Sequence, residues 1–348
     1  MEPSNKARIL LIYTGGTIGM VKDFETKALK AFNFKKLLQR IPELKQLDCD
    51  IETISFETPI DSSNMNPAQW ISMAEIIESN YEQFDGFVVL HGSDTMSYSA
   101  SALSFMLEHL QKPVVFTGSQ LPIGDLRTDA KENLITAIQI ASQLEEGRPV
   151  VREVCLYFEY KLYRGNRTTK VNAEHFKAFT SPNYPALAES GVHLNIVHEN
   201  LLRREISPAP FKVRKLLDSH IAIIKMFPGI NATVLNAILE IRDLKAIVLE
   251  TYGAGNAPSE AWFIDLLKQA IKRGLHIVNV TQCIAGSVQM GQYETSSALK
   301  EIGVISGKDI TTEAAVCKLM FLLGNETEFA DFKTAFETPI CGEMTFSS

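Results

Sequence analysis

The chain has 348 residues, of which 45% are hydrophobic and 22% are charged, and its formal net charge at pH 7 is −7. A chain of this size can bury a substantial core, and its length favours two domains over one. The acidic balance provides no basic field for a phosphate backbone, and lysines and arginines gather only in short pairs. Nucleic acid is therefore not an expected partner.

Targeting segments, disulfides and metals are not expected either. The apolar stretch near the N-terminus is too short for a signal-peptide core, and no other is long enough to span a bilayer, so the sequence predicts a cytoplasmic protein without a membrane partner. The five cysteines are widely spaced without a C-x-x-C pair, which is typical of reduced thiols. The histidines show no H-E-x-x-H or H-x-H spacing, so we expect no metal site.

Short β-branched runs alternate with helical patterns along the first half of the chain. Strands are expected at 9–13, 51–56, 86–90, 114–117 and 154–158. Helices are expected from residue 67, behind the candidate cap Asn66, and at 95–110 and 128–144. This alternation predicts a mostly parallel sheet with helices on both faces.

The pattern weakens between about 159 and 218, and a proline-bearing stretch near 205–210 is typical of a linker or an irregular hairpin. Alternation then returns. Strands are expected at 220–226, 246–251 and 275–280, with helices near 231–241, 258–272, 312–323 and 327–337. The sequence thus predicts a larger N-terminal α/β domain at 1–200, a linker at 201–215 and a smaller Rossmann-like α/β domain at 216–348.

Glycine beside a hydroxyl residue follows three of the predicted strands, in TGGT (14–17), HGSDT (91–95) and TGSQ (117–120). Glycine lets the backbone turn sharply and approach a ligand, while serine or threonine presents an oxygen at the rim. A single turn of this kind is more often structural, because strand-to-helix loops favour these residues for capping alone. Three such turns at strand ends favour a ligand site, since open α/β sheets bind ligands there.

Nucleotide and hydrolase signatures are incomplete or missing. TGGTIG (14–19) lacks the first glycine of the dinucleotide fingerprint, and GAGNAP (253–258) has proline in place of the third. The sequence contains no P-loop motif, and neither serine turn has the G-x-S-x-G pattern of α/β-hydrolases. A protein that binds a small ligand or dinucleotide without reacting with it stays an alternative.

A hydroxyl nucleophile that works without histidine is the remaining possibility. A lysine can take the proton of a hydroxyl when burial disfavours its charged form. Lys170 ends the polar segment YRGNRTTK (163–170), just after the strand predicted at 154–158. Taken alone, such a lysine is more often an ordinary solvated residue.

Several motifs together resemble the bacterial L-asparaginases of the cytoplasmic, type I kind. They are TGGTIG (14–19), DSSNM (61–65), HGSDTM (91–96), TGSQLP (117–122), LYRGNRTTK (162–170), YGAGNAP (252–258) and TQCIAG (281–286). The resemblance runs along nearly the whole chain. It implies two α/β domains, no cofactor, and a homodimer or homotetramer whose active sites form between subunits. The implied reaction is hydrolysis of L-asparagine to L-aspartate and ammonia through an acyl-enzyme.

The resemblance also implies catalytic roles. Thr17 matches the family's nucleophile, and Ser93 matches its second hydroxyl, in a relay with Asp94 and Lys170. Which hydroxyl attacks first stays open. A carboxylate at Asp94 favours a charged Lys170, whereas a general base must be neutral, so either desolvation prevails or proton transfer is concerted.

Substrate contacts are implied at Asp61 and Ser62, together with Ser93 and Asp94. A zwitterionic amino acid needs an anionic acceptor for its ammonium group and neutral donors for its carboxylate, both away from the reacting amide. The N–H groups of the glycine turns are candidate donors to the tetrahedral intermediate.

Ser93 stands where the family usually has threonine. The hydroxyl is kept, but without the methyl group its χ1 is less restricted, so we expect activity with a less rigid second hydroxyl. The catalytic tyrosine of the lid in type II relatives has no match within 22–30, where Phe24 lacks a phenolic hydroxyl.

An allosteric asparagine site of some type I enzymes is matched only in part. Thr169 and Cys283 agree with it, but Glu250 stands in place of an arginine. A carboxylate would repel the effector's carboxylate, so we expect this activation to be absent or altered.

Three other functions stay open beside asparagine hydrolysis. Mixed asparaginase and glutaminase activity is the nearest, because one methylene changes pocket fit by only about 1–3 kcal/mol. The non-catalytic binding protein is the second. The third is the related amidotransferase subunit, which carries an extra N-terminal domain, whereas the first strand here is expected near Arg8.

Overall fold

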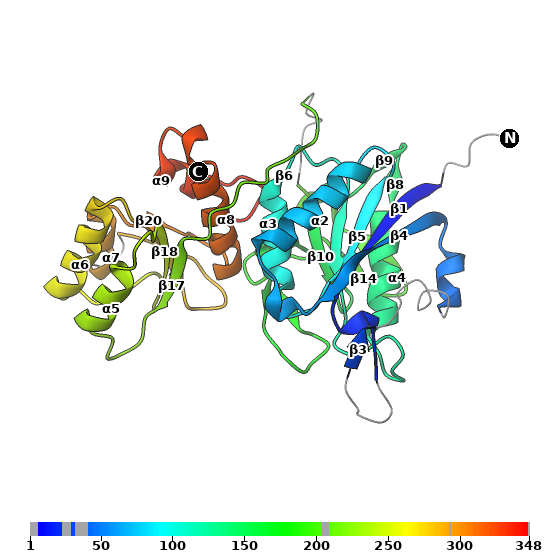
Figure 1. Ribbon diagram of the computed structural model, residues 1–348, viewed down its shortest axis with the longest axis horizontal. Coiled ribbons are helices and arrows are strands. Elements are labelled where there is room, and N and C mark those ends of the chain that lie inside the picture. The colour runs from blue at the N-terminus through cyan, green and yellow to red at the C-terminus, as the bar shows by residue number, and fades with distance from the viewer. Residues whose placement is uncertain (1–5, 23–28, 32–40, 203–208, 292–293, 347–348) are drawn as a thin grey trace. The chain divides into compact units, whose positions relative to one another are not determined.

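The structure is a computed structural model that describes residues 6–22, 29–31, 41–202, 209–291 and 294–346. The chain divides into two units, Met1–Arg214 and Lys215–Ser348 (Figure 1). Each unit has its own sheet and its own helices, and each is described by itself below.

An eight-stranded sheet with the order β15-β14-β11-β10-β7-β5-β1-β4 forms the centre of the first unit. The strands from β4 to β10 in that order pair in parallel, whereas β11, β14 and β15 pair antiparallel. The strands are β1 (Ala7–Gly15), β4 (Cys49–Ile60), β5 (Gly86–Leu90), β7 (Val114–Thr117), β10 (Val154–Phe158), β11 (Lys161–Arg164), β14 (Ala188–Ser190) and β15 (Leu194–Ile196).

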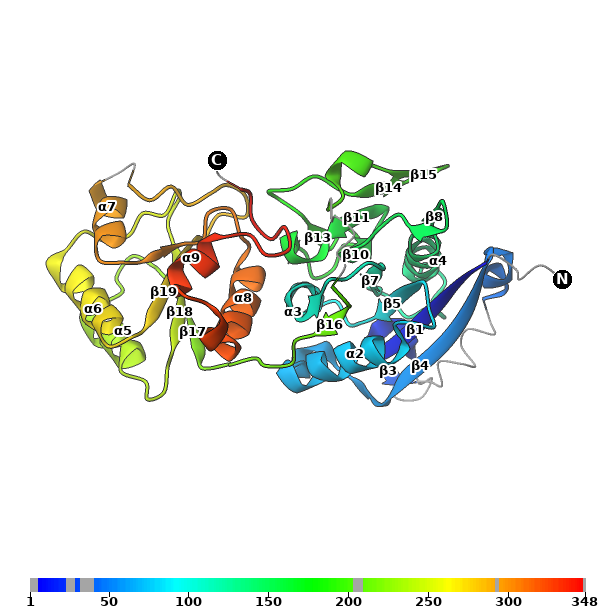
Figure 2. The ribbon, with the colours of Figure 1, turned by 90° about the horizontal axis from the view of Figure 1, so that it is seen from above.

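Helices cover both faces of this sheet, with α2 and α3 on one side and α4 on the other (Figure 2). They are α2 (Pro67–Asn80), α3 (Met96–Met106) and α4 (Ala130–Ala141). Asn66 caps α2: its side chain accepts from the N–H of Ala68, while Gln69 reaches back to the N–H of Asn66. Pro67 follows at the first helical position, where a missing N–H costs nothing.

Short strand pairs and single 3₁₀ turns complete the first unit. The pairs are β2 (Met20–Lys22) with β3 (Leu29–Ala31), β6 (Leu107–Glu108) with β16 (Lys212–Val213), β8 (Leu144–Glu145) with β9 (Arg148–Pro149), and β12 (Thr169–Lys170) with β13 (Phe179–Thr180). The turns are η1 (Thr17–Gly19), η2 (Pro42–Gln46), η3 (Ser62–Asn64), η4 (Gly165–Arg167) and η5 (His198–Asn200).

The second unit has a four-stranded parallel sheet with the order β17-β18-β19-β20. Helices α5 and α6 lie on one face of it and α8 on the other (Figure 2). The elements are β17 (Ile221–Lys225), α5 (Ala232–Leu239), β18 (Ala246–Thr251), α6 (Ala261–Lys272), β19 (His276–Thr281), α7 (Glu294–Glu301), β20 (Ile305–Ser306), α8 (Thr312–Gly324), η6 (Glu326–Glu328) and α9 (Phe332–Glu337).

The predicted fold class is confirmed: a larger, mostly parallel sheet with helices is followed by a smaller α/β unit. Some details differ from the sequence expectation. The helix expected near 327–337 is observed only at 332–337, after the turn η6. The antiparallel strands between 161 and 196 fall where the alternating pattern weakens. In addition, α3 ends at Met106 although apolar spacing continues to 110, because Leu107–Glu108 leaves the helix and pairs with Lys212–Val213 as strand β6.

A buried ion pair joins α8 to the C-terminal segment of the second unit. Lys318 Nζ lies 2.5 Å from Glu343 Oε1, and neither side chain is exposed to solvent. The ammonium also donates to the carbonyls of Phe336 and Thr338, each at 2.7 Å. The carboxylate in turn accepts from the N–H of Cys341 at 2.9 Å. The ion pair therefore fixes the chain after α9 through charged hydrogen bonds in a dry environment.

Removing one partner of this pair is expected to be strongly destabilising. Lys318→Met leaves a buried carboxylate without its cation, and Glu343→Leu leaves a buried ammonium, each at a cost on the order of 3–5 kcal/mol. The double variant leaves neither charge, so its loss of stability should be much smaller than the sum of the two. Thermal unfolding of all four proteins measures this coupling, and additive losses would contradict it.

Candidate active site

Three strand ends meet at one edge of the large sheet. Strands β7, β5 and β1 are parallel neighbours, so the loops that follow them lie side by side. These loops are the ones that carry TGSQ (117–120), HGSDT (91–95) and TGGT (14–17). The sheet topology therefore brings the three glycine-hydroxyl turns into one place, as ligand sites of open α/β sheets require.

Glycines let these loops touch one another. A Cβ atom on Gly16, which has φ +84°, would lie 2.5 Å from the backbone nitrogen of Gly92. A Cβ atom on Gly92 would lie 2.4 Å from Ser62 Oγ. The first turn thus packs on the second, and the second packs on the 61–63 segment. Thr17 and Ser93 each follow directly after a glycine of this contact.

Gly16→Ala is expected to disrupt the contact between the first two turns. Both the positive φ and the clash with the Gly92 backbone oppose a side chain, and a backbone obstacle cannot rotate away. Gly147→Ala is the matched control, because Gly147 also has a positive φ of +75° but no atom within 4 Å of the added Cβ. Unfolding temperatures should fall much further for Gly16→Ala, and equal losses would contradict the packing argument.

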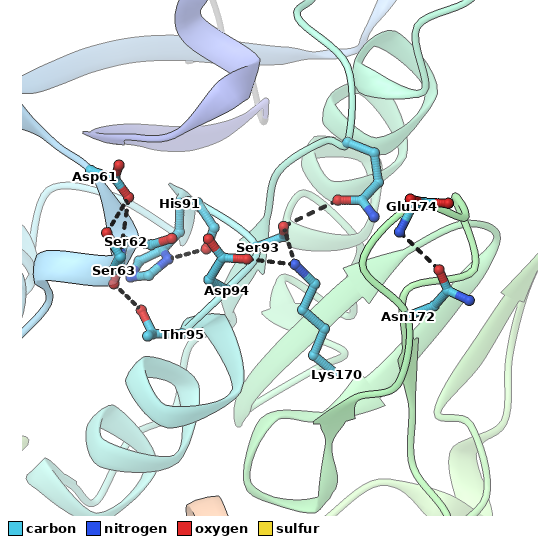
Figure 3. A network of polar contacts seen from close by, with 12 residues as sticks. Asp61, Ser62, Ser63, His91, Ser93, Asp94, Thr95, Lys170, Asn172 and Glu174 are labelled. Atoms are coloured by element: carbon cyan, nitrogen blue, oxygen red, sulfur yellow. Dashed lines mark hydrogen bonds and ion pairs between the residues drawn. The ribbon is translucent and has the colours of Figure 1, made fainter.

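Lys170 lies beside Ser93 and Asp94, as Figure 3 shows. Its Nζ donates to Ser93 Oγ at 2.9 Å and to Asp94 Oδ1 at 2.7 Å. The lysine side chain is 17% exposed, whereas that of Asp94 is 63% exposed. An amine, a hydroxyl and a carboxylate from segments 76 residues apart are thus in direct contact.

The segment before Lys170 is held against the start of α3. The buried Thr168 hydroxyl bridges Ser97 Oγ at 3.0 Å and the Gly165 carbonyl at 2.7 Å. Gly165 packs closely on the methyl group of Ala100, where a Cβ atom would lie 3.0 Å away. Because α3 follows directly after HGSDT (91–95), these contacts bring Lys170 to the loop that carries Ser93.

Asp61 and Ser62 stand on the next loop, after β4. Asp61 Oδ1 accepts from the N–H of Ser63 at 3.0 Å and from its hydroxyl at 2.9 Å. These bonds favour the carboxylate, so they lower the pKa of Asp61. Ser62 is buried, and its carbonyl accepts from the Thr95 hydroxyl at 2.7 Å (Figure 3). An exposed anion therefore stands on a loop tied to the start of α3.

Thr17 opens η1 and is half-buried. The next turn is tight: Gly19 lies against the Tyr13 ring, leaving no room for a side chain. Phe24, in the 22–30 segment where a lid tyrosine has no match, lies outside the described residues.

Comparison with known proteins gives the family. The chain matches "Asparaginase, N-terminal" over residues 8–202 and "Glutaminase/Asparaginase C-terminal domain" over residues 220–336. The chain belongs to the asparaginase family. It is 42% identical to L-asparaginase 1 of Escherichia coli K12, with 98% of each chain covered.

Solved structures agree with this family membership. L-asparaginase I from Vibrio cholerae has a TM-score of 0.89 and 40% identity, covering 98% of this chain and 100% of that one. The thermostable L-asparaginase from Thermococcus kodakarensis has a TM-score of 0.87 and 32% identity, with the same coverage. Within the described ranges of this asparaginase-family chain, no helix is both long and apolar enough to cross a membrane.

His91, the first residue of HGSDT, is fully buried beneath this site. Its Nδ1 lies 2.7 Å from the Gly92 carbonyl, which can only accept, so Nδ1 carries the hydrogen. Its Nε2 accepts from the Ser99 hydroxyl at 2.9 Å, and Ser99 Oγ in turn accepts from the Trp70 indole at 2.9 Å. The neutral ring satisfies both contacts. Burial lowers the pKa of His91 to about 4, so this histidine adds no charge beside Lys170.

The low pKa of His91 predicts a pH-dependent stability. An unfolded histidine binds a proton below about pH 6.5, whereas the folded one stays neutral to about pH 4. Stability should therefore fall as the pH drops through this window, by about 3 kcal/mol in all. Unfolding temperatures of the wild type between pH 7.5 and 4 should show this fall, and those of His91→Asn should show much less of it.

The exposed His193 provides the control for this titration. His193→Asn should keep the wild-type pH dependence, because this substitution leaves His91 and its buried contacts unchanged. If the unfolding temperatures of the wild type and of His91→Asn fell equally with pH, the assignment of this pH dependence to His91 would be contradicted.

Two contributors to this site were not named from the sequence. The role of His91 does not follow from the sequence, because its neighbours Trp70 and Ser99 come from two different helices. The role of Gln120 does not follow from the glycine and the hydroxyl of TGSQ (117–120). Yet Gln120 Oε1 accepts from Ser93 Oγ at 3.2 Å. The amide side chain at the end of TGSQ (117–120) was the signal in the sequence that could have indicated this contact.

The three residues matched to the allosteric site lie in different units. Thr169 belongs to β12 of the first unit, whereas Glu250 and Cys283 belong to the second. Glu250 accepts from the Thr312 hydroxyl at 2.7 Å and lies 3.8 Å from Lys225 Nζ. Cys283 is exposed, and its N–H donates to the Thr281 hydroxyl at 3.0 Å. Among the described residues, no group of three or more His, Cys, Asp or Glu side chains is arranged for a metal.

Proposed function

We propose that this protein hydrolyses L-asparagine to L-aspartate and ammonia without a cofactor, through an acyl-enzyme on Thr17. The observation that carries the proposal is the contact of Lys170 Nζ with both Ser93 Oγ and Asp94 Oδ1. A hydroxyl is a poor nucleophile unless its proton is removed, and this contact offers a path for that proton. The relatives compared above are named L-asparaginases.

The reaction divides into two steps. Thr17 Oγ attacks the side-chain amide carbon, its proton passes through the Ser93–Lys170 relay to the amide nitrogen, and ammonia leaves an aspartyl ester on Thr17. Water then attacks the ester, gives its proton to the relay, and releases aspartate with the threonine hydroxyl restored. Backbone N–H groups of the turns at 15–17 and 92–93 are the proposed donors to the oxyanion.

Substrate orientation comes from the acidic loops. The carboxylates of Asp61 and Asp94 are proposed to hold the α-ammonium group, with Ser62 and nearby backbone N–H groups at the α-carboxylate. The lowered pKa of Asp61 supports this role, because an acceptor for ammonium must stay charged. Glutamine is the near alternative substrate, since one added methylene changes the fit of a pocket by only about 1–3 kcal/mol.

Assembly, location and regulation complete the proposal. We propose a homodimer or homotetramer in the cytoplasm, with the sites completed between subunits as the resemblance implies. Asparagine activation through Thr169, Glu250 and Cys283 is proposed to be absent or altered. Glu250 is a carboxylate held by the Thr312 hydroxyl, so it cannot pair with the carboxylate of an effector.

Thr17→Ala is expected to lower kcat for asparagine by about a thousandfold or more, because no acyl-enzyme can form. Thr17→Ser keeps a hydroxyl and should retain part of the activity. A coupled ammonia assay of the three proteins on asparagine and glutamine, side by side, measures both the role and the preference. Turnover by Thr17→Ala near that of the wild type would remove this residue from the mechanism.

A further inference from the structure

Gln120 links the Ser93 hydroxyl to a separate loop. Its Oε1 accepts from Ser93 Oγ at 3.2 Å, and its Nε2 donates to the His175 carbonyl at 3.0 Å. The His175 carbonyl can only accept, so the amide nitrogen must face it and the amide oxygen must face Ser93. The orientation of this side chain is thus fixed by its two partners.

Both ends of this link are anchored. The N–H of Gln120 donates to the half-buried carboxylate of Asp129 at 2.9 Å. On the other side, Asn172 Oδ1 accepts from the N–H of Glu174 at 2.8 Å (Figure 3). It also accepts from the N–H of His175 at 2.8 Å, and so shapes that loop. The backbone of Gln120 and the loop that carries the His175 carbonyl are therefore each held by a side chain.

The contacts of Ser93 fix the direction of its proton. The Gln120 oxygen can only accept, so the Ser93 hydrogen points toward Gln120. Lys170 then supplies the hydrogen of the other contact, and a lone pair of Ser93 faces its Nζ. In this arrangement the hydroxyl oxygen is fixed by two hydrogen bonds, while its proton stays on the side away from the lysine.

We propose that Gln120 is the positioning residue for the Ser93 hydroxyl. Serine lacks the γ-methyl group that restricts χ1 of threonine, so its oxygen is free to leave the relay unless something else holds it. The Gln120 amide supplies that constraint by a hydrogen bond. At 3.2 Å the bond is long for a hydroxyl donor, so it can release the proton when the reaction needs it. The inference rests on the proposed relay and adds a residue to it.

The test compares Gln120→Met in two backgrounds. Methionine keeps the length of glutamine but has no amide, so Ser93 loses its acceptor. In the wild-type background, kcat for asparagine should fall about three- to tenfold with little change in KM, as expected for one hydrogen bond acting on the reacting groups. In the Ser93→Thr background the same substitution should lower kcat less than twofold, because the branched side chain restricts χ1 without help.

Controls separate positioning from structure. Gln143→Met changes an exposed glutamine away from this site and should leave kcat and unfolding temperature unchanged. In Ser93→Ala, where there is no hydroxyl to hold, Gln120→Met should not change the residual rate of ammonia release. The Ser93→Ala background also provides the comparison if Ser93→Thr turns over asparagine too slowly to measure.

The outcomes are distinct. An unchanged kcat in Gln120→Met, a loss expressed in KM, or an equal loss in all three backgrounds would overturn the positioning role. Those results would leave asparagine hydrolysis itself standing. A wild-type chain that releases no ammonia from asparagine would instead overturn the proposed function and this inference with it.

Discussion

The site depends on one constraint: the ammonium group of Lys170 must be paired and hydrogen-bonded. Lys170 is mostly buried, and a charge in that position is costly unless it is paired and hydrogen-bonded. Ser93 and Asp94 supply those bonds from the loop after β5. The packing of the 165–168 segment on α3 serves this contact, because it carries the lysine to the loop rather than to solvent.

The parallel part of the sheet was predictable because its signals are local. The strands at 86–90, 114–117 and 154–158 are continuous apolar runs, and their observed bounds agree with the prediction. Parallel pairing then places their following turns at one edge. The sequence also predicted that the glycine turns allow a close approach of the backbone, since glycine has no side chain to obstruct it. Which backbones meet, Gly16 with Gly92, required the tertiary structure.

The place of Lys170 was not predictable from pattern alone. The strands between 161 and 196 have only two to four residues each, which is too short for an alternating apolar pattern to be recognised. The resemblance of LYRGNRTTK (162–170) to a known motif pointed to the lysine. His91 and Gln120 lie within quoted motifs, but their contacts were not predictable, because their hydrogen-bond partners Ser99, Trp70, Ser93 and His175 come from other segments.

The two partners of Lys170 have different places in the proposed reaction. Its Nζ donates to Ser93 Oγ at 2.9 Å and to Asp94 Oδ1 at 2.7 Å. Under the proposed function, the ammonium group of the substrate would compete with Lys170 for the exposed carboxylate of Asp94. Substrate binding would then weaken the ion pair and leave the contact of Lys170 with the Ser93 hydroxyl, which is the contact that the proposed relay uses.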